Sequence, residues 1–160
     1  MIKISKKTLQ DLEFESVIQQ VASHNVTSLG KNEILATLPF SQREDVIEAL
    51  RLTNEFVSSF DNENRIPNHG FDAITAELKL IRIENNYLEI DGFRKIASIC
   101  VTTNILLKFF KKFHEYYPLL HKVSLQLDAN KDIPEAIHSV VDKFGEIRND
   151  ASDTLYGLRK

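Results

Sequence analysis

Apolar side chains recur at helical spacing along most of this 160-residue sequence, and few turn-forming residues interrupt them. The chain has only five glycines and four prolines, so long stretches run without a break. Apolar residues three and four positions apart predict amphipathic helices, whereas strict alternation predicts strands. Alternation is seen only in the opening MIKIS, which is too short to support a strand. The pattern therefore predicts an all-α fold with little or no strand.

The first half of the chain contains several predicted helices separated by one clear loop. Helices are predicted over residues 9–21 (as one or two short helices), 27–38, 42–60 and 74–85. Residues 61–70, DNENRIPNHG, are rich in turn-forming side chains and predict an irregular loop between the last two of these helices.

The longest predicted helix covers about residues 91–117, and Pro118 prevents an easy continuation. Its apolar residues cover an arc of roughly 200° on a helical wheel. A second apolar stripe, formed by Val101, Ile105 and Phe109, lies outside that arc. A helix that is apolar almost all round is buried on several sides. We expect either the central helix of an irregular bundle, or a helix that presents this second stripe to another domain.

Two further helices are predicted near the C-terminus. The cleanest helical stripe in the chain consists of Ile133, Ile137, Val140, Val141, Phe144 and Ile147. It predicts a helix that continues to Arg148. After a polar turn, Ser152 is a good N-cap for a last helix that carries Leu155 and Leu158. That helix runs for about two turns in this sequence, and a helix so short is only marginally stable alone.

Composition and charge exclude few classes of function. Twenty basic and 23 acidic residues give a formal net charge of −3, which favours neither nucleic acid nor any other partner. The single cysteine, Cys100, excludes an intrachain disulfide and suits a reducing cytoplasm. No apolar run approaches the roughly 20 residues of a membrane span. We therefore predict one cytoplasmic helical domain over residues 1–160, without a membrane partner, that buries roughly two thirds of its unfolded surface.

Two motifs suggest chemistry only superficially. TSLGKNE, residues 27–33, resembles the end of a phosphate-binding loop, but Asn25 and Asn32 replace the glycine and the Ser or Thr that such a loop requires. HEYYPLLH places His121 seven residues after His114, whereas a zinc-protease helix needs a spacing of four. We predict no catalytic, cofactor-binding or metal-binding residue in this chain.

Residues 94–122 carry six basic side chains and one acidic side chain, Glu115. Within them, KFFKKFHEYY interleaves Lys108, Lys111 and Lys112 with aromatic residues, as surfaces that bind single-stranded nucleic acid do. The aromatic residues fall mostly on the predicted core arc, so we expect them to be packed and not free to stack on bases. A solvated basic face is the favoured interpretation, and nucleic-acid contact through the three lysines is the alternative.

The order of four segments resembles the N-terminal part of the MutS type-two proteins, the bacterial MutS paralogues that lack the mismatch-reading domain. The segments are ISKKTLQDLEFESVIQQVASHNVTSLGKNEILATLPF, NRIPNHGFDAITAELKL, LEIDGFRKIAS and DKFGEIRNDASDTLYGLRK. Their most specific features are an L-x-x-L-x-F opening, a P-x-x-G-F-D-x-I turn at residues 67–74 and a G-E-I-R-x-x-A-S close at residues 145–152. The resemblance covers essentially the whole chain.

The resemblance implies that the last helix begins a long lever leading to a clamp, followed by an ATPase domain and usually a nuclease domain. Residues 1–160 would then be the N-terminal fragment of a MutS-like core domain that continues past Lys160. ATP and Mg would bind downstream, so this chain would not be catalytic alone. Its partners would be the lever, the clamp and the ATPase of its own polypeptide, and branched DNA or the ribosome for the full-length protein.

Three functions are therefore open. The first is a coupling core segment of a DNA-processing ATPase that suppresses homologous recombination, acts in DNA repair or rescues ribosomes, as the resemblance implies. The second is a stand-alone helical protein–protein interaction module that docks a partner on the second stripe. The third is an autonomous nucleic-acid binder that uses the basic segment.

Overall fold

The computed structural model describes residues 4–159, and within them the chain forms nine helices. In order they are α1 (Lys6–Asp11), α2 (Phe14–Ser23), α3 (Ser28–Leu35), α4 (Arg43–Ser58), α5 (Thr75–Ile81), α6 (Ile90–Lys112), α7 (Pro118–Ser124), α8 (Asp132–Val140) and α9 (Asp153–Leu158). The only β-type pairing among the described residues is an isolated antiparallel bridge between Val141 and Ile147. The all-α prediction is confirmed. No helix in the described part of the chain has the length and apolarity to cross a membrane.

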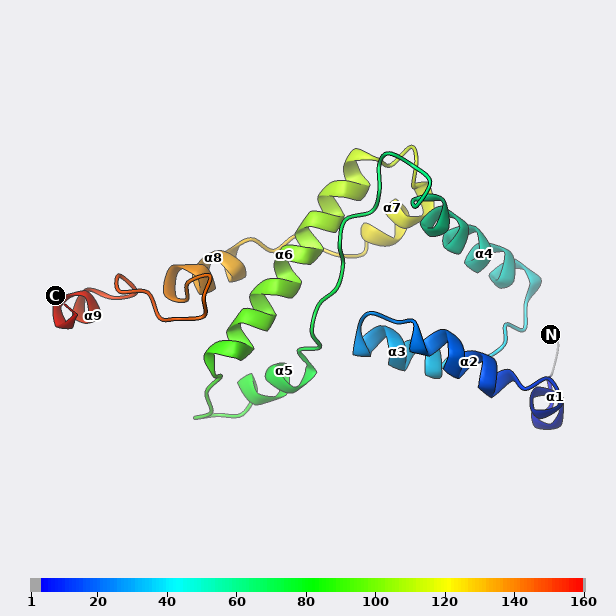
Figure 1. Cartoon of the computed structure of the whole chain (residues 1–160), viewed down its shortest axis with the longest axis horizontal. Helices are drawn as coiled ribbons and strands as arrows, with labels where there is room; N and C mark the ends of the chain where they lie inside the picture. Colours follow the sequence, from blue (N-terminus) through cyan, green and yellow to red (C-terminus); the bar gives the residue numbers. More distant parts are fainter. Residues whose placement is uncertain (1–3, 160) are drawn as a thin grey trace.

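Seven of the nine described helices pack in two groups that lie along an elongated molecule (Figure 1). In the first group α2 packs against both α1 and α3, and in the second α6 packs against α7 and α8 while α7 also packs against α4. The 23-residue α6 lies in the middle, and α1 and α9 lie at opposite ends of the longest axis. The expected long central helix is present, but its neighbours are spread along it and do not enclose it.

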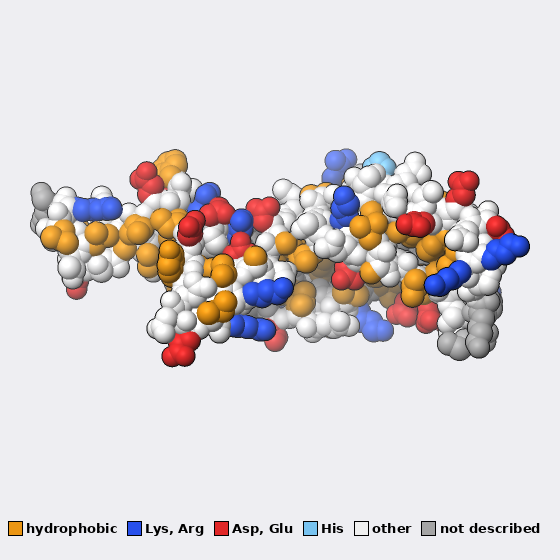
Figure 2. All heavy atoms as spheres, turned by 90° about the horizontal axis from the view of Figure 1, so that it is seen from below, with side chains coloured by type: hydrophobic (Ala, Val, Ile, Leu, Met, Phe, Trp, Pro, Cys, Tyr) orange, Lys and Arg blue, Asp and Glu red, His pale blue; other side chains and the backbone are white. Residues whose placement is uncertain are grey.

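The chain exposes much more surface than a compact monomer of its size. Its accessible surface is 12876 Å² for a mass of 18.4 kDa, whereas a folded monomer of that mass exposes about 8,200 Å². The buried apolar residues in the described range are Ala22, Ile96, Ala97, Phe110, Tyr117 and Val141. Figure 2 shows apolar side chains on the surface in patches along the molecule. The prediction of two thirds burial is wrong, because the fold buries only about half of the unfolded surface.

The long helix α6 ends at Lys112, five residues before the predicted boundary. The residue before a proline is disfavoured in the helical region, and Tyr117, which precedes Pro118, has φ −129° and ψ 59°. The carbonyl of Phe113 accepts hydrogen bonds from the two amides just before the proline, at 3.0 and 3.1 Å, which closes a turn. This turn reverses the chain into α7, a helix that the sequence pattern did not predict.

The helix predicted to continue to Arg148 ends at Val140, and that part of the prediction is wrong. The chain instead folds into a tight turn, residues 141–148, which we call the 141–148 turn. The Asp142 N–H donates to the Glu146 carbonyl, and the Arg148 N–H donates to the Val140 carbonyl, both at 2.9 Å. These two bonds form the isolated bridge noted above.

Local hydrogen bonding explains why the helix stops. The Asp142 carboxylate accepts hydrogen bonds from the backbone N–H groups of Phe144 and Glu146, both at 2.9 Å. Such side-chain bonds give the backbone an alternative to the helix. Gly145 has a φ of +85°, a left-handed conformation that glycine adopts without strain. The apolar stripe was misleading, since Val141 is buried whereas Phe144 is 75% exposed.

Hydroxyl side chains start three of the helices. Ser5, Thr27 and Ser152 each accept a hydrogen bond from the backbone N–H three residues later, at 3.1 to 3.2 Å. These bonds satisfy amides that lack a partner within the helix, and the predicted N-cap at Ser152 is confirmed. Gly30 follows the cap of α3, where an added Cβ would lie only 2.6 Å from the Asn25 Oδ1. An added Cβ would therefore require the Asn25 side chain to move, which is one local reason for glycine in TSLGKNE.

Candidate inter-domain interface

The C-terminal end of α6 is tightly packed by four aromatic residues. The ring centroid of Phe109 lies 4.8 Å from Phe113, 5.5 Å from Phe110 and 5.7 Å from Tyr117. We call these four residues the aromatic corner. Tyr117 is fully buried, and its hydroxyl donates a 2.6 Å hydrogen bond to the Asn64 carbonyl. That bond attaches the loop after α4 to the junction of α6 and α7.

Glu55 on α4 fixes the start of α7. Its carboxylate accepts hydrogen bonds from the backbone N–H groups of Leu119 and Leu120, each at 3.0 Å. A carboxylate in this position satisfies free amides at a helix N-terminus and complements the positive end of the helix dipole. Because Glu55 lies 64 residues before Leu119, no local sequence signal predicts this contact.

Only part of the predicted inter-domain stripe is open. Val101 is 36% exposed and Ile105 is 48% exposed on the surface of α6. Phe109 is half-buried, because its ring belongs to the aromatic corner. The structure therefore divides the predicted stripe into an exposed pair, Val101 and Ile105, and a packed residue.

The predicted basic residues Lys108, Lys111 and Lys112 are all exposed in the last turns of α6. The Nζ of Lys112 lies 4.8 Å from the centroid of the Phe113 ring, a cation–π contact within the chain. Cations here also complement the negative end of the helix dipole. The three ammonium groups can contact phosphates as point charges, but the rings between them are packed and do not form a stacking platform.

The structure brings together two histidines that seven sequence positions separate. Because α6 ends early and α7 folds back, the ring centroids of His114 and His121 lie 5.7 Å apart. With Lys111 and Asp128 they line a hollow of about 640 Å³. Over residues 4–159, no three His, Cys, Asp or Glu side chains are placed to hold a metal ion.

Polar contacts position α5 and the segment before α8 on α6. The Lys95 Nζ lies 3.3 Å from a carboxylate oxygen of Glu77 on α5 and 2.9 Å from one of Asp91. The Asn104 side chain exchanges two hydrogen bonds with the backbone of Asn130: its amide donates to the carbonyl at 2.6 Å, and its oxygen accepts from the N–H at 2.9 Å. The Lys95–Glu77 contact thus joins α5 to α6, and the Asn104–Asn130 bonds join the segment before α8 to α6.

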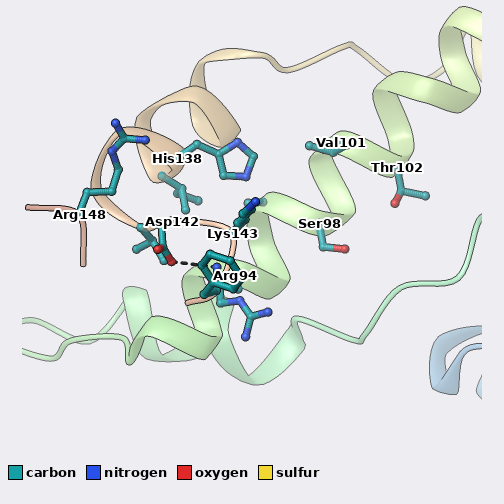
Figure 3. Close-up of a pocket in the computed structure, with 12 residues that line it drawn as sticks. Arg94, Ser98, Val101, Thr102, His138, Asp142, Lys143 and Arg148 are labelled. Atoms are coloured by element: carbon teal, nitrogen blue, oxygen red, sulfur yellow. Dashed lines mark hydrogen bonds between the residues drawn. The ribbon is translucent and has the colours of Figure 1, made fainter. Parts of the chain in front are cut away.

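An open groove of about 650 Å³ lies between α6, α8 and the 141–148 turn (Figure 3). We call it the α6–α8 groove. Its apolar lining consists of Ala97, Val101, Ile137, Val141 and Phe144, and its basic lining consists of Arg94, His138, Lys143 and Arg148. Of these residues only Val101 belongs to the interface stripe that the sequence predicts, because the other side chains meet only once the turn has formed.

The one acidic residue in the lining, Asp142, is already engaged by the backbone. The hydrogen bond from the Glu146 N–H is the main cause that holds the pKa of the Asp142 carboxyl below its usual value. Partial burial opposes this shift, and the bond from the Phe144 N–H adds to it. Arg148 forms a two-pronged ion pair with Asp150, with both N···O distances 3.0 Å. The groove is therefore apolar at its base and basic at its edge.

Together these features define an open all-α segment with one packed aromatic corner and several uncovered apolar faces. No family model matches the chain. It is similar over almost its whole length to proteins named MutS2. The putative endonuclease MutS2 of Bacillus subtilis (strain 168) is 28% identical over 159 residues, which cover 98% of this chain and 20% of that protein.

Two further relatives agree with that match. The endonuclease MutS2 of Geobacillus sp. (strain WCH70) is 29% identical over 157 residues, covering 96% of this chain and 20% of that protein. The endonuclease MutS2 of Pelotomaculum thermopropionicum is 26% identical over 157 residues, covering 98% of this chain and 20% of that protein. The predicted resemblance is confirmed. The chain spans about a fifth of the length of the curated relatives it matches, consistent with a segment of a MutS2 protein.

Proposed function

We propose that this chain is a structural and coupling segment of a MutS2-like DNA-processing protein and is not catalytic alone. The observation that carries the proposal is the pattern of similarity, which covers 98% of this chain but only 20% of the Bacillus subtilis relative. The large exposed surface supports it as well. Apolar faces that other parts of a polypeptide cover are exposed when a segment is taken alone, and large exposed apolar patches mark interaction sites.

The resemblance supplies the finer part of the proposal. The helix α9 would begin the lever, and the lever, clamp and ATPase would be the partners of the exposed pair Val101 and Ile105. ATP and Mg would bind in the downstream ATPase. The full-length protein would act on branched DNA, in recombination suppression and repair, or on the ribosome. In this arrangement the packed aromatic corner would hold α6, α7 and the loop after α4 together as one unit of the coupling segment.

The gene provides the first test. A reading frame that continues past Lys160 into a Walker motif supports the proposal. A stop codon directly after Lys160 would remove it and favour the alternative of a stand-alone helical protein–protein interaction module.

Cysteine labelling tests whether α6 is covered. In a Cys100→Ser background, Ile105→Cys is expected to react readily with a maleimide in the 160-residue chain, because Ile105 is 48% exposed. In a polypeptide that carries the downstream domains, we expect labelling to be at least about tenfold slower, as for a site that is reached only by local opening. Tyr87→Cys is the control, since Tyr87 is 79% exposed on a loop. Equal rates at position 105 in both proteins would contradict the proposal.

Nucleic-acid binding by the chain alone is the second candidate, and the exposure of Lys108, Lys111 and Lys112 favours it. Three lysines that release about three counterions give a log–log salt slope near −3. We expect weak duplex binding with this slope, lost when the three lysines are replaced by glutamine. Tight binding at physiological salt that survives this replacement would show that another surface binds the DNA.

A further inference from the structure

The α6–α8 groove combines an apolar base with basic side chains at its edge, and we infer that it docks an acidic amphipathic helix. The inference goes beyond the proposed function, because it names the chemistry of the bound segment and does not require this chain to be part of a larger protein. It rests on the residues that line the groove and on the cations at its edge that have no carboxylate partner.

The base of the groove suits the apolar face of a helix. Ala97 and Val101 from α6 face Ile137 from α8 and Val141 from the start of the 141–148 turn. Ala97 and Val141 are buried, whereas Val101 stays 36% exposed and Phe144 at the rim stays 75% exposed. Uncovered apolar side chains above a packed floor are the usual arrangement where a groove receives an amphipathic helix. The volume of about 650 Å³ has room for several side chains of such a helix.

The edge of the groove selects the charge of the partner. In Figure 3, His138 and Lys143 point into the space between α8 and α6. Arg94 lies at the edge beside the turn, where a Cβ on Gly145 would be 3.2 Å from its Cδ. Among residues 4–159 neither Arg94 nor Lys143 forms an ion pair, since the ion pairs present there use Lys95 and Arg148. The Lys143 Nζ lies 4.9 Å from the centroid of the Phe144 ring, a cation–π contact that leaves its charge without a carboxylate partner.

The groove lining contains one carboxylate, Asp142, and among residues 4–159 no ion pair joins it to Arg94 or Lys143. The Asp142 Oδ1 already accepts two backbone hydrogen bonds. Carboxylates on the flanks of a docked helix would complement these cations. A nucleic-acid strand would also satisfy them, and its bases would have Phe144 at the rim to stack on, but it would leave the aliphatic base at Val101 and Ile137 without an apolar partner. The observations therefore favour a protein segment.

A synthetic peptide provides the probe. We would use a fluorescein-labelled helix of about 20 residues with leucines at i, i+3, i+4 and i+7 and glutamates on both flanks. The matched control carries lysine at every glutamate position. In anisotropy titrations with the 160-residue chain, we expect the glutamate peptide to bind at least about tenfold more tightly than the lysine peptide, and its binding to weaken with added salt. Equal affinity of the two peptides, or no binding of either, would overturn the inference.

A pair of variants locates the binding. Ser98 lines the groove and is exposed on α6, so Ser98→Glu and Ser98→Lys introduce long side chains of opposite charge without removing a packed group. We expect Ser98→Glu to weaken binding and Ser98→Lys to preserve or strengthen it, with the two separated by about tenfold. A folding defect that both variants share would lower both affinities equally. The sign of the difference between the two affinities would therefore still report the effect of charge. Lys122→Gln, an exposed change on α7 outside the groove lining, should leave binding unchanged.

Three results of this experiment would overturn the inference. Equal effects of the two Ser98 variants would place the peptide elsewhere or show that charge does not matter. A loss of binding in Lys122→Gln as large as in Ser98→Glu would mean non-specific attraction. A 20-base-pair duplex that binds more tightly than the glutamate peptide and responds in the same way to Ser98→Glu would identify nucleic acid as the occupant. A stop codon after Lys160 would end the proposed coupling function but would leave all of these binding results unaffected.

Discussion

The two ends of α6 are built in different ways. At its C-terminal end, the aromatic corner is packed, and two residues distant in sequence, Asn64 and Glu55, add hydrogen bonds to it and to α7. At its N-terminal half, α8 leaves the open groove of about 650 Å³, with Val101 and Phe144 exposed beside it. One helix thus carries a self-sufficient corner and a surface that its own chain does not cover. The difference indicates where the chain is packed against itself and where it has an uncovered surface to offer a partner.

The largest expected effect is at the centre of the aromatic corner. Tyr117→Ala removes a fully buried ring and the hydroxyl bonded to Asn64, so we expect a loss of about 3–5 kcal/mol in the free energy of unfolding. Tyr117→Phe removes only the hydroxyl and should cost about 1–2 kcal/mol. Urea unfolding followed by circular dichroism measures both values. A loss below about 1 kcal/mol for Tyr117→Ala would show that the corner does not stabilise the fold.

The second prediction compares two residues of the second apolar stripe, Phe109 and Ile105. Phe109→Gln should cost about 2–3 kcal/mol, because its ring contacts three other rings of the corner. Ile105→Gln, one helical turn earlier, should cost less than about 1 kcal/mol, because the side chain is 48% exposed. The same urea titrations compare the two variants. Equal losses would mean that Ile105 is as well packed as Phe109, and the contrast between the two ends of α6 would disappear.

The third prediction tests the link from α4 to α7. Glu55→Ala removes the acceptor for two backbone amides and should cost about 1.5–3 kcal/mol, the range for hydrogen bonds to a charged group. Glu55→Gln keeps one acceptor oxygen and should lose roughly half as much. Glu48→Ala, an exposed glutamate on the same helix, is the control and should stay within about 0.5 kcal/mol of the parent. If Glu48→Ala and Glu55→Ala lose the same amount, a cause common to glutamates of α4, and not the contact with α7, is responsible.

The sequence predicts those structural features that depend on local signals. The apolar period located α2, α4 and most of α6, and the hydroxyl of Ser152 marked the start of α9 correctly. It also located Val101 and Ile105 on a face that the chain leaves exposed. These features depend on residues within one or two turns of each other, so a periodic pattern or a capping residue is sufficient to find them.

The sequence could not predict contacts between distant segments. Nothing near Glu55 or Tyr117 indicates that one binds the amides of α7 and the other the loop carbonyl of Asn64. The 141–148 turn was missed for a different reason, since its apolar residues also fit a helical period. Its local signals were present in Asp142 and Gly145, whose turn chemistry outweighs a stripe that continues for only two more residues. The groove forms only where that turn folds back beside α6, so the sequence did not predict the groove either.

The smallest expected effect is a pH response at the groove that the aromatic corner should not share. Backbone hydrogen bonds to the ionised Asp142 hold its pKa in the folded chain below the unfolded value of about 3.9. This carboxylate therefore stabilises the 141–148 turn above that pH, and the contribution is lost as the pH falls through the lower folded pKa.

Amide proton shifts from pH 6 down to pH 2 test this last point. We expect the Phe144 and Glu146 amides, which donate to Asp142, to move together along one titration curve whose midpoint lies below about 3.9. The amide of Tyr117 should not follow that curve. In Asp142→Asn the side-chain oxygen still accepts but does not titrate, so the two amides should start with weaker bonds and show no such curve. An unchanged curve in Asp142→Asn would assign the acid response to another group and remove Asp142 as the residue that holds this side of the groove in place.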